Sequence, residues 1–172
     1  EIRADVAEHG NERRTTLVAR QEAQAIDAAD LAPAEPVTVI LSEKGWIRAA
    51  KGHDIDPTQL NYKAGDDYFE SVRGKTNQTI LLLDSNGRSY ALSALGLPSA
   101  RSLGEPITGK LAPTSGAEMI GMLMPSHNET VILCSTAGYG FKTTTDQMMT
   151  KNKTGKACLN IGDSEPLPPL LV

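Results

Sequence analysis

The stretch LSEKGWIRAAKG, residues 41–52, predicts two short strands joined by a tight turn at Gly45. Two later stretches, LLDSNGRSYALS (82–93) and ILCSTAGYGFKT (132–143), follow the same plan. Each has an apolar run, a small or polar turn, and a strand that carries an aromatic residue. The chain therefore repeats one hairpin three times, and this repetition decides the fold.

The outgoing strand of each predicted hairpin is almost wholly apolar, which is typical of strands buried on both faces in a closed or stacked sheet. The Asn86-Gly87 pair predicts a type I′ turn in the second hairpin, because both residues accept a positive φ. The predicted outgoing strands are 36–42, 79–85 and 130–136, and the predicted return strands are 46–50, 88–93 and 139–143.

Glycines outside the turns recur at a period near 50 residues. Gly52, Gly104 and Gly155 are 52 and 51 residues apart, and Gly65 and Gly116 are again 51 apart. Such a period, with several strands in each unit, is typical of a propeller-like array whose neighbouring units cover one another's apolar faces. About three blades are expected in residues 36–162, with a further, truncated blade beginning in 163–172.

Residues 1–35 differ from the rest and read as a connector rich in Ala, Glu and Asp. Helices are expected at 1–8 and at about 19–31, with a short extended piece near Thr15–Val18. Pro33 and Pro36 end this connector.

The net charge of −4 is unevenly distributed along the 172 residues. The connector holds eight acidic and four basic residues, and residues 161–172 hold two acidic residues and no base. Residues 36–160 carry thirteen Lys and Arg against eleven Asp and Glu. A mildly basic repeat between acidic flanks is compatible with a surface that binds phosphates.

The sequence contains no recognisable catalytic or metal-binding pattern. Gly74-Lys75-Thr76 resembles the end of a phosphate-binding loop, but Phe69 stands where that loop needs a glycine. The histidines and the two cysteines lack metal-ligand spacing, and the HDID stretch at 53–56 is best read as a solvated turn. The absence of a long apolar run and of a signal peptide favours a cytoplasmic protein without a membrane partner.

Basic residues recur near the glycines, in phase with the repeat. In a radial array, residues in phase lie along one rim, where they could follow a bent phosphate backbone. The candidate DNA-binding residues are Arg48, Lys51, Lys63, Arg73, Lys75, Arg88, Arg101, Lys110, Lys142, Lys151, Lys153 and Lys156. The aromatic residues that follow the turns, Trp46, Tyr90, Tyr139 and Phe141, are expected to pack between blades.

Three long strings carry a specific resemblance: residues 35–66, 84–111 and 137–157 resemble the C-terminal domain of the A subunit of bacterial topoisomerase IV. HGNERRT (9–15) is similar to the junction that follows the DNA-cleaving core in that protein and in its gyrase counterpart. The resemblance covers nearly the whole chain and implies an all-β fold, the β-pinwheel, with hairpin blades that exchange strands with their neighbours.

The same resemblance implies a non-catalytic module that binds and bends duplex DNA for an ATP-dependent type II topoisomerase, which decatenates chromosomes and relaxes supercoils. Partners implied in this way are double-stranded DNA, a chromosome-condensing complex and the topoisomerase IV B subunit, all in the bacterial cytoplasm near the nucleoid. The family's catalytic tyrosine, ATP and magnesium belong to other regions, so this stretch is expected to hold no cofactor.

Three alternatives remain open at this point. A gyrase-type domain would wrap DNA fully, but AAKGHDI, ARSLGEPI and NKTGKAC lack the paired arginines and glycines of the gyrase signature, so weaker wrapping is expected. A propeller-like protein-interaction module is compatible with the near-neutral charge. A small hydrolase has almost no support in the sequence.

Overall fold

The computed structural model describes residues 2–11 and 33–172. Helix α1 spans Ile2–His9 and confirms the first helix expected in the connector. The extended piece expected at 15–18 and the helix expected at 19–31 lie outside the described residues.

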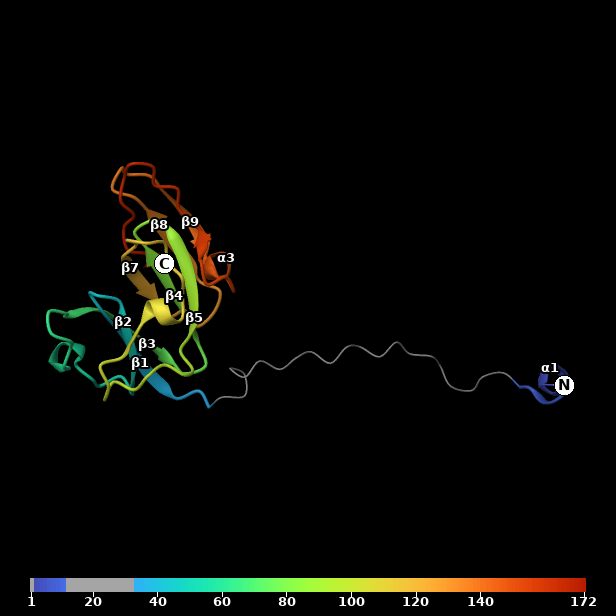
Figure 1. Cartoon of the computed structure of the whole chain (residues 1–172). Coiled ribbons are helices and arrows are strands. Elements are labelled where there is room, and N and C mark those ends of the chain that lie inside the picture. Colours follow the sequence, from blue (N-terminus) through green and yellow to red (C-terminus); the bar gives the residue numbers. More distant parts are fainter. Residues whose placement is uncertain (1, 12–32) are drawn as a thin grey trace.

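Three antiparallel sheets form the body of the protein, one around each predicted hairpin (Figure 1). Sheet A has the strand order β3-β1-β2-β6, sheet B the order β10-β5-β4-β7, and sheet C the order β11-β8-β9. In sheet A, β1 is Pro36–Ser42, β2 Trp46–Lys51, β3 Tyr68–Lys75 and β6 Glu105–Pro106. In sheet B, β4 is Thr79–Asp84, β5 Arg88–Ser93, β7 Met119–Leu123 and β10 Lys156–Ala157. In sheet C, β8 is Thr130–Cys134, β9 Gly140–Thr144 and β11 Leu170–Leu171.

The hairpins are confirmed, but the predicted turn type is wrong. In the second hairpin the amide of Gly87 donates to the carbonyl of Asp84 at 3.0 Å, and Gly87 has a φ of 71°. Among the described residues only glycines have positive φ, so Asn86 does not adopt the conformation that a type I′ turn requires. The observed geometry instead matches the common three-residue hairpin loop, in which a type I turn is followed by a residue, here glycine, with a positive φ. Gly45 and Gly138 make the same bond, to Ser42 and Ser135.

Each of the first two sheets receives its fourth strand from the following hairpin. Residues 94–104, which we call the second arm, leave β5 and cross to sheet A, where β6 pairs with Trp46 and Ile47. Residues 145–155, the third arm, leave β9 and cross to sheet B, where β10 pairs with Arg88 and Ser89. The first hairpin has no such arm, because Gly52 follows β2 directly. This exchange is the strand-swapping of a pinwheel.

Two apolar layers hold the three sheets together. The first layer lies between sheets A and B and includes Leu41, Ile47, Leu82 and the fully buried Tyr90. The second lies between sheets B and C and includes Leu81, Leu83, Leu133 and Met148. Strand β4 contributes alternate residues to the two layers, so both of its faces are buried and its sequence is apolar without interruption.

The aromatic residues of the third hairpin do not pack between blades. Tyr139 is 79% exposed and Phe141 is 45% exposed, so the prediction is wrong for both, whereas Tyr90 confirms it. Trp46 is half-buried. Phe141 pairs with Leu133 of the second layer, so it lies on the face of sheet C toward sheet B, but on the outer strand of that sheet.

Short helices and edge strands complete the fold. The 3-10 helices η1, Pro57–Gln59, and η2, Ile107–Gly109, lie in equivalent loops, and α3, Thr145–Met148, begins the third arm. Asp56 caps η1 by accepting from the amide of Thr58, and the Thr58 bonds lower the pKa of Asp56. Strand β11 pairs with β8, so residues 170–171 belong to sheet C in this chain. The proposed boundaries at 35 and 162 stay a prediction.

Candidate nucleic-acid interface

In each sheet the return strand, β2, β5 or β9, pairs with the outgoing strand on the side away from β3, β7 or β11. The two crossing arms reach sheets A and B on this same side, where β6 pairs with β2 and β10 pairs with β5. We call this side the arm edge. Candidate basic residues lie on it in every sheet: Lys51 and Arg101 at sheet A, Lys151, Lys153 and Lys156 at sheet B, and Lys142 on β9. All six are exposed, and their role in binding stays a prediction.

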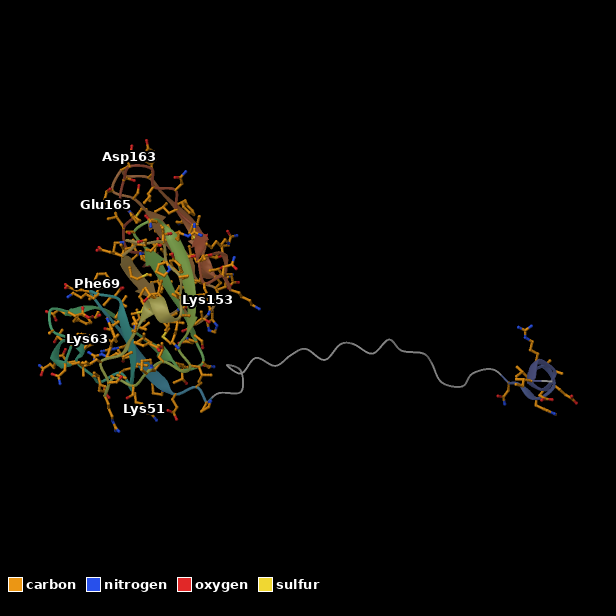
Figure 2. The ribbon with its side chains drawn as sticks, viewed as in Figure 1. Lys51, Lys63, Phe69, Lys153, Asp163 and Glu165 are labelled. Carbon is orange, nitrogen blue, oxygen red and sulfur yellow. The ribbon has the colours of Figure 1, made fainter. Side chains whose placement is uncertain are left out.

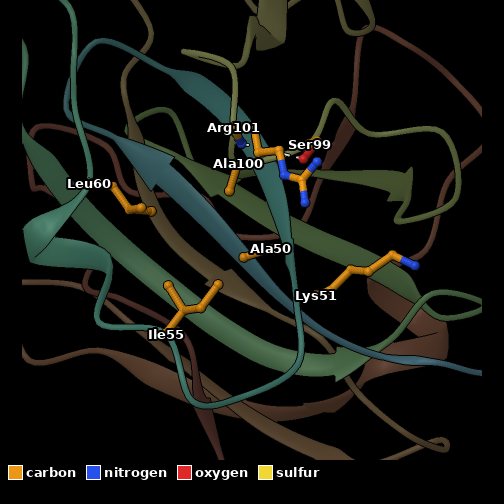
Figure 3. Close-up of a pocket in the computed structure, with 7 residues that line it drawn as sticks. All are labelled: Ala50, Lys51, Ile55, Leu60, Ser99, Ala100 and Arg101. Atoms are coloured by element: carbon orange, nitrogen blue, oxygen red, sulfur yellow. Dashed lines mark hydrogen bonds between the residues drawn. The ribbon is translucent and has the colours of Figure 1, made fainter.

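A hollow of about 710 Å³ lies on the arm edge of sheet A, between β2 and the second arm. Its lining combines apolar residues with two bases: Ala50, Lys51, Ile55, Leu60, Ser99, Ala100 and Arg101. In Figure 3 the side chains of Ile55 and Leu60 lie on one side of Ala50, and those of Lys51 and Arg101 lie on the other. The hollow thus brings together Lys51, from the first hairpin, and Arg101, from the arm that follows the second hairpin.

Backbone pairing holds the Arg101 side of this hollow in place. The second arm runs parallel to β2 at one bridge, between Ser99 and Ala49. The amide of Ala100 donates to the carbonyl of Ala49, and the amide of Ala49 donates to Pro98, both at 2.8 Å. Residue 101 is therefore carried to β2 although it follows β5 in sequence by eight residues.

Lys51, the other base of the hollow, forms an ion pair with Glu35 at 3.2 Å. The Lys51 side chain is 91% exposed and the Glu35 side chain 51% exposed. An ion pair in water contributes little and exchanges readily, so Lys51 remains available to a phosphate.

At sheet B, the third arm and β10 present three lysines beside β5, two from the arm and one from the strand. Lys156 begins β10, and its Nζ donates to the carbonyl of Gln147 at 2.6 Å. Arg88, the fourth candidate here, is half-buried and donates to the carbonyls of Thr154 and Gly155. Arg88 thus fixes the arm that carries the lysines, and its guanidinium is already engaged.

Arg48 is not on the rim, and this prediction requires correction. Its side chain is buried, with 3% of its surface exposed, and its Nη1 donates to the carbonyls of Asn61 and Ser102. The guanidinium also lies over the Tyr62 ring, 4.5 Å from the centroid. Burial raises the pKa of the Tyr62 hydroxyl, and the nearby Arg48 opposes that rise. Because side chains alternate along β2, Arg48 lies on the face of the strand that these loops cover. The position of a base in the sequence does not show that the loops will cover it.

The remaining candidates are dispersed. Lys63 lies over the Trp46 ring, 3.3 Å from the centroid, and Lys110 pairs with Glu105 at 3.0 Å. Arg73 and Lys75 are exposed on β3, on the opposite side of sheet A from the arm edge. The structure therefore brings together some candidates and separates others.

Charged side chains of both signs lie at the two ends of the stack of sheets. Figure 2 shows Lys51 and Lys63 at the sheet A end and Asp163 and Glu165 at the sheet C end. Residues 35–75 hold seven acidic and six basic residues, so the lysines of the sheet A end lie among carboxylates.

Other kinds of site find little support in residues 2–11 and 33–172. Within that part of the chain, no group of three or more His, Cys, Asp or Glu side chains is arranged to hold a metal ion. Nor does any helix there have the length and apolar character needed to cross a membrane.

Comparison with solved structures defines the class to which this architecture belongs. The E. coli ParC C-terminal domain superimposes with a TM-score of 0.77 at 47% identity, covering 81% of this chain and 57% of that chain. The DNA gyrase A C-terminal domain superimposes with a TM-score of 0.62 at 16% identity, covering 80% and 50% respectively, and shares the fold alone. The protein is thus a β-pinwheel of the kind found at the C-terminus of topoisomerase A subunits.

Sequence comparison finds full-length proteins that are similar to this chain. The A subunit of DNA topoisomerase 4 from Haemophilus influenzae is 50% identical over 164 residues, covering 95% of this chain and 22% of that protein. The chain is therefore homologous to the C-terminal region of the DNA topoisomerase 4 A subunit, which confirms the resemblance seen in the sequence. It spans about a fifth of the length of this relative. No family model matches the chain.

Proposed function

We propose that this protein is a non-catalytic module that binds and bends double-stranded DNA through the arm edge. The observation that carries the proposal is the recurrence of exposed bases beside both crossing arms, at Lys51 and Arg101 on sheet A and at Lys153 and Lys156 on sheet B. Bases repeated on successive blades contact successive phosphates, and following a curved array requires the duplex to bend.

The homology supports a larger setting for this module. In a topoisomerase IV A subunit it would present duplex DNA to a catalytic core for strand passage during decatenation and supercoil relaxation. The B subunit, ATP and magnesium would act in other regions of that enzyme in the bacterial cytoplasm. Identity of 50% to a topoisomerase IV protein favours this setting over a gyrase, to which only the fold relates the chain.

The direct test is binding of the 172-residue protein to a fluorescent duplex of about 40 base pairs across a salt series. We expect affinity to fall steeply with salt and to be alike for unrelated sequences, because the arm edge offers bases for phosphates. Replacing Lys51, Arg101 and Lys156 together with glutamine should lower the affinity and reduce the salt slope by about 2 to 3.

A matched control replaces the exposed bases on the opposite side, Arg73→Gln and Lys75→Gln. This variant loses two charges without touching the arm edge, so its affinity should fall much less. Equal losses in the two variants would show that binding follows net charge and not the arm edge. Absence of binding by the unaltered protein at low salt would overturn the proposed function itself.

A further inference from the structure

Arg48 combines features that stability alone does not explain. It is buried, and within residues 33–172 no carboxylate forms an ion pair with it. Its Nη2 atom is buried without a hydrogen-bond partner. A buried guanidinium in this state is costly, and an apolar side chain of similar size often packs as stably or better.

The two carbonyls that Arg48 holds belong to segments far apart in the sequence. Asn61 lies in the loop after η1 of the first hairpin, and Ser102 lies in the arm that comes from the second hairpin. The two bonds are 2.9 and 3.0 Å long and share one nitrogen of the guanidinium. One side chain therefore links two loops across the surface of β2.

Each of these carbonyls is adjacent in sequence to a residue that lines the 710 Å³ hollow. Asn61 follows Leu60, which lines its apolar part, and Ser102 follows Arg101, one of its two bases. Ala50, which lies on the same face of β2 as Arg48, lines the space between them. Arg48 is thus placed beneath the hollow, where it fixes two opposing walls.

We infer that Arg48 is a positioning residue for DNA binding, which holds Arg101 beside Lys51 so that both cations reach one stretch of phosphate backbone. Arg48 itself touches no phosphate. The inference rests on the proposed function, because it assigns a task to the hollow of the arm edge. It differs from a general packing role, since it predicts that the contribution of Arg101 depends on residue 48.

A double-mutant cycle tests this dependence in the 172-residue protein. Arg101→Gln alone should weaken duplex binding by about tenfold and lower the salt slope by about 1. Arg48→Met, which keeps the length and removes the donors, should cause a loss of similar size while the protein stays folded. The double variant should bind no more weakly than Arg48→Met alone, because Arg101 is already misplaced.

Tyr90→Phe provides a matched control. Tyr90 occupies the position in sheet B that Arg48 occupies in sheet A, three residues after the turn glycine. It also has a hydrogen bond to lose, but it lies in the layer between sheets and not beneath the hollow. In the Tyr90→Phe background, Arg101→Gln should keep its full effect.

Arg48→Lys supplies a second variant should Arg48→Met fail to fold. Lysine retains the charge but reproduces only part of the hydrogen bonding to the two carbonyls. In the Arg48→Lys background, the effect of Arg101→Gln on duplex binding should therefore shrink but not vanish. Additive effects of the single changes in folded variants would overturn the positioning role. Failure of the unaltered protein to bind duplex would instead overturn the proposed function, so the two failures are distinguishable.

Discussion

Sheets A and B use the same hairpin and the same crossing arm, yet they place different chemistry beneath the arm. In sheet A the residue three positions after the turn glycine is Arg48, which donates to two loop carbonyls. In sheet B it is Tyr90, whose hydroxyl donates to the buried carboxylate of Asp84 at 2.7 Å. The first arrangement ties loops to the strand, and the second ties the strand to its own turn.

The turns themselves continue this difference. Asp84 accepts at Oδ1 from the amides of Asn86 and Arg88, both at 2.9 Å. Ser42, at the same position in sheet A, accepts from the amide of Trp46 at 3.0 Å and donates to Asp66 at 2.7 Å. The central sheet therefore closes its polar network internally, whereas the first sheet relies on outlying loops. Sheet B, which contacts both apolar layers, is the structural centre, and sheet A is an end sheet held by its loops.

The largest expected effect is at the buried carboxylate of the central sheet. Asp84→Ala leaves the Tyr90 hydroxyl and two turn amides without their acceptor, so we expect a loss of about 3 to 5 kcal/mol in the free energy of unfolding. Ser42→Ala should cost only about 1 kcal/mol, because the Asp66 carboxylate that loses its donor is partly exposed and can bind water instead. Urea unfolding followed by circular dichroism measures both.

Asp84→Asn refines this comparison, since the amide oxygen can still accept from the turn amides. Its loss should fall between those of the other two variants. Equal losses for Asp84→Ala and Ser42→Ala would show that the two turns are held equally and would remove the distinction between sheets.

The next effect concerns the glycine that ends the third arm at sheet B. Gly155 has a φ of 72°, and an added Cβ would lie 2.6 Å from the Tyr90 ring. Gly155→Ala should therefore lower the free energy of unfolding by about 3 kcal/mol, through both strain and overlap. Gly138 has a φ of 81° with open space around it, so Gly138→Ala should cost about 1 kcal/mol.

Thermal unfolding of the two alanine variants measures this difference. If Gly155→Ala lowers the free energy of unfolding no more than Gly138→Ala does, the third arm can shift without destabilising the protein. That result would contradict close packing of residue 155 against Tyr90.

The sequence predicted the hairpins and their repetition well, because apolar runs beside glycines depend only on local chemistry. It also indicated the period, and Gly104 and Gly155 do end the two arms with positive φ. The unequal spacing of the turn glycines, 42 residues from Gly45 to Gly87 and 51 from Gly87 to Gly138, shows where the first arm is missing.

Other features could not be predicted from local patterns. Strand β3 has no buried residue and mixes polar with apolar side chains, so its sequence YFESVRGK carries little strand signal until β1 pairs with it. The burial of Arg48 depends on carbonyls 13 and 54 residues away in sequence. In each case the deciding contact is long-range.

Alkaline titration sharpens the contrast between Tyr90 and the exposed Tyr139. Burial raises the pKa of Tyr90 from 10.0 to about 12, and its bond to Asp84 acts in the same direction. Between these pH values the unfolded phenol is ionised and the folded one is neutral, so stability is lost as the pH rises. We expect this group to remove about 2 to 3 kcal/mol from the free energy of unfolding.

The measurement compares the unaltered protein with Tyr90→Phe from pH 9 to about 12. The unaltered protein should lose stability more steeply with pH than Tyr90→Phe, whereas Tyr139→Phe should keep the original slope. Parallel curves for all three proteins would contradict the assignment of the shift to the buried hydroxyl.

The smallest effect lies at Glu70 in β3 of sheet A, whose counterpart in sheet B is Gly121 in β7. The Oε2 atom of Glu70 is buried without a partner, and burial raises the pKa of this carboxyl above 4.5, with the amide of Met122 partly opposing. The folded state therefore favours the protonated carboxyl, and its stabilising contribution is lost as the pH rises through the folded pKa. Glu70→Gln should stabilise the protein slightly at pH 7.

This gain should disappear at a pH near 3, where glutamate is protonated in both states and resembles glutamine. Urea unfolding at the two pH values measures the change. A gain that persists unchanged at low pH would mean that the carboxylate charge is not its cause. The expected result would show that sheet A keeps an unpaired charge where sheet B has only glycine, so the end of the stack is less optimised for stability than its centre.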